Sequence, residues 1–91
     1  MSAIKNLIQA LRYDRTIPLC WHLASIAYGR NNQMGMSALM LAEYNELTGR
    51  PADARQQAKK AIRILSKNSP GWIRAQDILR QNKKVRQHNA K

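Results

Sequence analysis

The sequence predicts an all-α protein made of antiparallel helical hairpins, about five helices in a short right-handed array. Every apolar pattern in the 91-residue chain has a helical period, and no segment alternates as a strand does. The connections between patterned segments are only a few residues long, which favours antiparallel neighbours. The apolar residues also recur at a shift of 34 residues, which indicates a repeated hairpin.

The first two predicted helices cover residues 4–11 and 16–30. One face of the first is formed by Ile4, Leu7, Ile8 and Leu11, spaced i, i+3, i+4 and i+7. The second is apolar nearly all round, so we expect it to be covered on two sides. Asn31 and Asn32 follow it and are predicted to end it.

The third and fourth helices are predicted over residues 34–48 and 51–67. Gly49 lies between them and suits a helix C-terminus, because glycine accepts a positive φ without a Cβ clash. Pro51 suits the first turn of the fourth helix, where its missing N–H is not needed. Asp53 places a negative charge at the positive end of the same helix.

A fifth helix is predicted over residues 70–79, with Ser69 as its N-cap and Pro70 at its first position. We expect Trp72 to fix this helix against the preceding hairpin. Beyond it the apolar pattern fades. The predicted organisation is therefore one helical domain over residues 1–81 and a basic, disordered tail over residues 82–91.

The 34-residue shift aligns equivalent positions of successive hairpins. Ile4, Ala38 and Trp72 coincide in the first helices, and Ala24 meets Ala58 in the second helices. This period is that of the tetratricopeptide repeat, in which small residues let paired helices approach closely. Two alternatives stay open. One is an arbitrary helical bundle, and the other is a register in which Trp21 and Tyr28 mark first helices.

Three segments carry a closer resemblance, namely "WHLASIAYGR", "GMSALMLAEYNELTGRPADARQQAKKAI" and "SPGWIRAQDIL". In this order they resemble the C-terminal tetratricopeptide region of bacterial periplasmic HExxH zinc metallopeptidases. The resemblance implies a region that holds substrates or assembly partners beside a separate catalytic domain. The catalytic HExxH helix and the third zinc ligand of that family have no counterpart here, so no catalytic residue is carried over.

The chemistry-bearing residues do not indicate an enzyme. The chain has one cysteine, Cys20, and two separated histidines, His22 and His88, so we expect no metal and no cofactor. No Ser/His/Asp, Cys/His or paired-carboxylate spacing stands out. As written, the sequence has no signal peptide and predicts a cytoplasmic protein. A fragment of the resembled family would instead belong in the periplasm.

The first helices of such an array line its concave face. The register predicts a peptide-binding surface of mixed polarity there, and that composition suits an extended or helical peptide. Its candidate residues are Lys5, Gln9, Arg12, Met36, Leu39, Glu43, Glu46, Ile73, Asp77 and Arg80. The predicted function is a non-catalytic protein–protein interaction module that holds a protein or peptide partner.

The positive charge is concentrated in the second half of the chain. The net charge is +11, and residues 50–91 hold twelve of the sixteen Lys and Arg residues. Four of them, spaced four apart, form a basic ridge that consists of Arg55, Lys59, Arg63 and Lys67. The alternative function is therefore a small basic adaptor for nucleic acid or anionic membrane. An ordinary solvated helix face explains the same spacing.

The remaining large and small apolar residues are expected to be structural. We assign Trp21, Tyr28, Ala58, Ala61 and Trp72 to the core. The array ends on a helix with no following partner, so a homodimer through this terminal helix is also expected.

Overall fold

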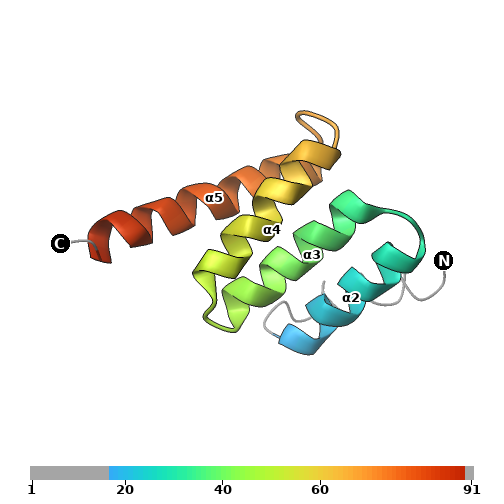
Figure 1. Cartoon of the computed structure of the whole chain (residues 1–91), viewed down its shortest axis with the longest axis horizontal. Helices are drawn as coiled ribbons and strands as arrows, with labels where there is room; N and C mark the ends of the chain where they lie inside the picture. Colours follow the sequence, from blue (N-terminus) through green and yellow to red (C-terminus); the bar gives the residue numbers. More distant parts are fainter. Residues whose placement is uncertain (1–16, 90–91) are drawn as a thin grey trace.

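The computed structural model describes the backbone of residues 17–89 and the side chains of residues 17–81. This part of the chain is all-helical and contains no strand. Its four helices are α2 (Pro18–Arg30), α3 (Met34–Leu47), α4 (Pro51–Ile64) and α5 (Pro70–Asn89), shown in Figure 1. The predicted helix over residues 4–11 lies outside the described residues, so four of the expected five are seen.

Helix α3 lies between α2 and α4, and it packs against both (Figure 1). Helix α5 packs mainly on α4 and also reaches α3. Each of α3, α4 and α5 therefore contacts the helix before it in the chain, and α3 and α5 also touch each other. The all-α prediction with short connections is confirmed over this part of the chain.

The helix ends follow the local sequence signals. Gly49 has φ of 75°, and the Arg50 N–H behind it donates to the Asn45 carbonyl at 2.8 Å. This pair of features is the Schellman motif, which satisfies the last carbonyls of α3. Asn32 closes α2 in the same way, with φ of 60°, and the Gln33 N–H donates to Tyr28 at 2.9 Å.

The predicted helix starts are confirmed as well. Pro51 opens α4, and Asp53 lies in its first turn. Helix α5 begins at Pro70, and the Ser69 hydroxyl accepts a hydrogen bond from the Trp72 N–H at 3.3 Å. That bond satisfies one of the free N–H groups that every helix N-terminus presents.

Small residues fill the contact between α3 and its neighbours. Ala54, Ala58 and Ala61 of α4 are completely buried, as is Ala42 of α3. A Cβ on Gly35 would stand 2.8 Å from Leu65 Cδ2, so only glycine fits there without a shift. Small side chains therefore let the helices of this hairpin approach closely, as the sequence predicted. Ala58 and Ala61, together with Trp21 and Tyr28, are core residues as expected.

Trp72 departs from its expected role. Its side chain is only partly buried, and it stands outside the hydrophobic core. The residues of α5 that enter the core are Ala75 and Ile78, both completely buried. Trp72 lies in the first turn of α5, whereas Ala75 and Ile78 lie about one and two turns further along the helix. The prediction that Trp72 is a core residue is therefore wrong.

Residues 82–89 were expected to be a disordered tail. Their backbone instead continues α5 as far as Asn89. The stretch is rich in Gln, Lys and Arg, which have high helix propensity. Extending an existing helix also avoids the unfavourable nucleation step.

Helix α2 is covered less completely than its composition suggested. Trp21, Ser25 and Tyr28 are buried on the side that faces α3. Leu19, however, is 62% exposed, and Leu23 and Ile26 are exposed as well. Among residues 17–81, none covers this face of α2, so the described part of the chain covers α2 on the α3 side only.

Candidate functional site

The predicted peptide-binding surface combines α3 and α5, which the 34-residue shift in the sequence aligns with each other. Lys5, Gln9 and Arg12 lie outside the described residues. The others are spaced three or four residues apart on their helices, so each set shares one helix face. The α3 residues are Met36, Leu39, Glu43 and Glu46, and those of α5 are Ile73, Asp77 and Arg80.

The start of α5 covers the middle of the α3 face. Leu39 is only 3% exposed, and Met36 is half-buried. A Cβ on Gly71 would stand 3.1 Å from Met36 Sδ and 3.4 Å from Leu39 Cδ2. The absent side chain of Gly71 thus lets α5 lie close to α3. Leu39 is part of the packing and does not line an open groove.

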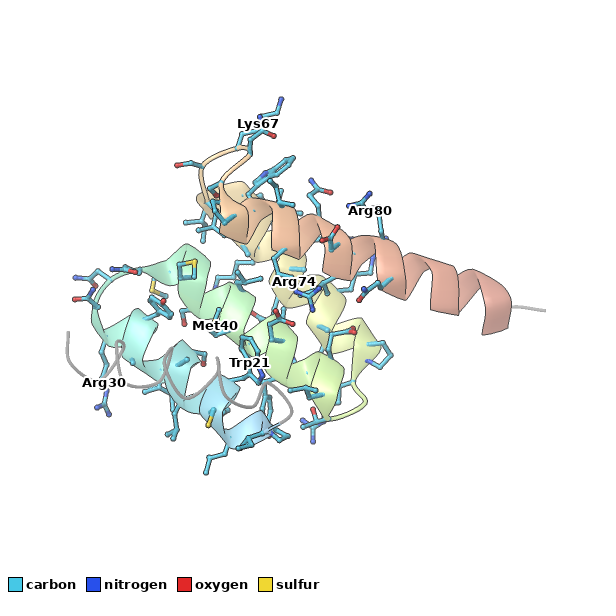
Figure 2. All side chains as sticks on the ribbon, turned by 180° about the vertical axis from the view of Figure 1, so that it is seen from behind. Trp21, Arg30, Met40, Lys67, Arg74 and Arg80 are labelled. Atoms are coloured by element: carbon cyan, nitrogen blue, oxygen red, sulfur yellow. The ribbon has the colours of Figure 1, made fainter. Side chains whose placement is uncertain are left out.

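Glu43 is also buried, and an ion pair with Arg74 accounts for it. Arg74 Nε donates to Glu43 Oε2 and Arg74 Nη2 donates to Glu43 Oε1, each at 2.7 Å. These bidentate bonds raise the pKa of Arg74 above its ordinary value, against a smaller opposing effect of burial. Figure 2 shows Arg74 reaching from α5 toward α3. The pair therefore joins α5 to α3.

Arg74 was not among the site residues predicted from the sequence. Arg74 lies 31 residues after Glu43 and not at the repeat distance, so aligning equivalent positions does not bring the two together. One usable signal was the buried-face position of Glu43, because a carboxylate placed there needs a partner. Arg74 lies on α5, the helix that the 34-residue shift aligns with the helix of Glu43.

We predict that the Glu43–Arg74 pair contributes measurably to stability. A double-mutant cycle with Glu43→Gln and Arg74→Met should give a coupling free energy of about 1–2 kcal/mol, between the values for exposed and buried pairs. The measurement is urea unfolding of the four proteins.

The Asp77–Arg80 pair supplies the matched control. Both of its side chains are substantially exposed, and Arg80 is bonded to Asp77 within the same helix. The corresponding cycle with Asp77→Asn and Arg80→Met should give a coupling near zero. Equal coupling free energies in the two cycles would show that the Glu43–Arg74 pair contributes no more to stability than an exposed pair does.

What remains accessible on the candidate surface lies mainly on α5 and at the end of α3. Ile73 is 47% exposed, Arg80 is exposed, and Glu46 and Asp77 are half-buried. Leu39 occupies the position equivalent to Ile73, one repeat earlier, and it is covered by α5. Nothing among the described residues covers Ile73 in the corresponding way. Ile73, Asp77 and Arg80 thus share one accessible face of α5, and Glu46 is the accessible candidate on α3.

The basic ridge is only partly a solvent-facing row. Lys59, Arg63 and Lys67 are exposed, and Lys67 projects from the loop that leads into α5 (Figure 2). Arg55 is half-buried, and its Nε is enclosed with no hydrogen-bond partner. The three outer cations form the part of the ridge that a large anion can reach.

Two further chemistry-bearing residues, Cys20 and His22, lie on α2. Cys20 is a free thiol that packs partly against the core. His22 stacks at a tilt on Tyr44, with ring centroids 4.9 Å apart. Within the described part of the chain, no three His, Cys, Asp or Glu residues are grouped to hold a metal ion. Among the same residues, no helix is long and apolar enough to span a bilayer.

Comparisons with known proteins leave the family open. No family model matches the chain, and no curated protein or solved structure matches it significantly.

Proposed function

We propose that this chain is a non-catalytic protein-interaction module built from tetratricopeptide-like hairpins, which holds a peptide segment of a partner protein. The observation that carries the proposal is the junction of α3 and α5. Helices α3 and α5, which the 34-residue register puts at equivalent positions, lie together and are joined by Glu43 and Arg74. Completely buried alanines between α3 and α4 support the same repeat.

The accessible part of this surface sets the chemistry of the peptide. Exposed Ile73 offers an apolar contact, while Glu46 and Asp77 supply negative charge in a chain of net charge +11. Such a surface suits a short segment with one apolar anchor and a neighbouring Lys or Arg. The resemblance to the metallopeptidase region suggests the same role, a domain that holds partners beside a catalytic unit.

Selection from a displayed library of random peptides tests this proposal. We expect binders that combine an apolar residue with a basic one. Their affinity should fall at least about tenfold in an Ile73→Asp variant, because the apolar contact is lost. A matched control is Ile64→Asp, since Ile64 is exposed to a similar degree at the end of α4. Equal losses in the two variants, or no selected binder, would contradict the proposal.

A second function, binding of nucleic acid, is favoured by one observation. Lys59, Arg63 and Lys67 are exposed together on one helix and its following loop. Titration with single-stranded oligonucleotide at low and moderate salt tests it. Binding through the ridge should weaken steeply with salt and disappear in the triple variant Lys59→Gln, Arg63→Gln, Lys67→Gln. Undiminished binding in this variant would exclude the ridge.

A further inference from the structure

One face of α2 carries exposed apolar side chains that the interaction surface does not use. We call Leu19, Leu23 and Ile26 the α2 stripe; they are spaced i, i+4 and i+7 and all exposed. The opposite side of α2 faces α3, as the hydrogen bond from Ser37 Oγ to the Ser25 carbonyl at 2.7 Å shows. The stripe thus points away from α3.

The stripe is not the usual outer face of a helix in this chain. The equivalent positions of α4, 34 residues later, are Asp53, Gln57 and Lys60, as expected beside water. Helix α2 has no charged residue before Arg30 at its end. Three large aliphatic side chains of α2 therefore occupy positions at which α4 has polar side chains.

We propose that the α2 stripe binds the α2 stripe of a second copy of this chain, as an antiparallel two-fold pair. The first argument is charge. Residues 50–91 bring twelve Lys and Arg residues against two acids, so most faces of two copies repel each other. Residues 17–29 carry none of that charge, and contact through α2 brings no basic side chain into its centre.

The second argument is geometric self-complementarity. Leu19 and Ile26 lie at the two ends of the stripe, with Leu23 near its middle. In an antiparallel pair, Leu19 meets Ile26 of the second copy, and the two Leu23 side chains meet at the axis. A two-fold interface requires such reciprocal contact of one patch with itself. Arg30 lies one turn beyond the stripe, at the rim.

Other occupants fit less well. A membrane surface or a nucleic acid would need cations beside the stripe, and α2 offers only Arg30. Pairing through α5, the expectation from sequence, would bring together two helices whose residues 70–89 each hold five Lys and Arg against one acid. The stripe is one short helix face, smaller than the ~800 Å² per partner of a standard interface, so the dimer should be weak.

Sedimentation equilibrium over a concentration series tests the proposal on the full chain. We expect a monomer–dimer equilibrium with a dissociation constant on the order of 10–100 μM. Leu23→Lys and Leu23→Glu should each raise this constant at least about a hundredfold, because like charges then meet at the axis. An equimolar mixture of the two variants should dimerise again, since Lys then faces Glu.

The control is Ile73→Lys, which has the same net charge as Leu23→Lys and alters the exposed face of α5. It should leave dimerisation unchanged, and circular dichroism should show that every variant remains helical. A wild-type protein that is monomeric up to about 1 mM would overturn the proposal. So would dissociation by Ile73→Lys, or a mixture that stays monomeric. Helix α2 is not part of the peptide-binding surface. A negative result for dimerisation therefore leaves the proposed function intact, and a failed peptide selection leaves the dimer intact.

Discussion

Replacing Ile78 with alanine is expected to lower the free energy of unfolding by about 2–5 kcal/mol. Ile78 is the largest completely buried side chain among the described residues, and it belongs to the core that α5 shares with the preceding helices. Truncation removes three buried carbon atoms and leaves a cavity that closely packed neighbours fill only partly. Urea unfolding followed by circular dichroism measures the effect.

Two other positions on α5 provide the comparison. Ile73→Ala makes the same chemical change at an exposed site, and it should alter stability by no more than about 0.5 kcal/mol. Trp72→Ala should cost less than Ile78→Ala, although tryptophan is the larger residue, because Trp72 is only partly buried. A larger loss for Trp72 than for Ile78 would show that Trp72 anchors the helix after all.

Ala58→Leu is expected to destabilise the protein by about 1–3 kcal/mol. Ala58 is completely buried, with Ala54 and Ala61 one turn away on either side, along the face that α4 turns toward α3. A leucine side chain needs space that this close approach does not leave. The two helices must then separate, or the side chain must adopt a strained rotamer.

Ala52→Leu is the matched control for that substitution, because Ala52 is exposed in the first turn of the same helix. Both alanine and leucine favour helices, so this variant should stay within about 0.5 kcal/mol of wild type. Thermal unfolding of the three proteins distinguishes the effects. If both variants are equally stable, the α3–α4 contact accommodates a leucine at position 58, and small residues are not required there.

The ends of α2 and α3 and the starts of α4 and α5 were predictable because their causes are local. Gly49 ends α3 through its own conformational freedom, and Ser69 caps α5 through its own hydroxyl. Each signal acts within about four residues, so the sequence displays it directly. The buried alanines of α4 were equally predictable, since their spacing marks a single helix face.

The candidate surface was predictable only in part. The register correctly placed its described residues on one face each of α3 and α5, but exposure depends on how closely those helices meet. Gly71 allows α5 to lie against α3, which buries Leu39. That approach also brings Arg74 to Glu43. The position of each residue within its own helix does not indicate this contact.

By itself, the sequence determined an all-helical chain, the ends of α2 and α3, the starts of α4 and α5, and the small-residue face of α4. These properties follow from backbone preferences and from periodicity within one helix. Only the tertiary structure decided that Ile78 and not Trp72 enters the core, that Glu43 is paired, and that the α2 stripe is exposed. Each of these depends on the distance and rotation between helices, because burial is a property of two packed surfaces and not of one residue's type.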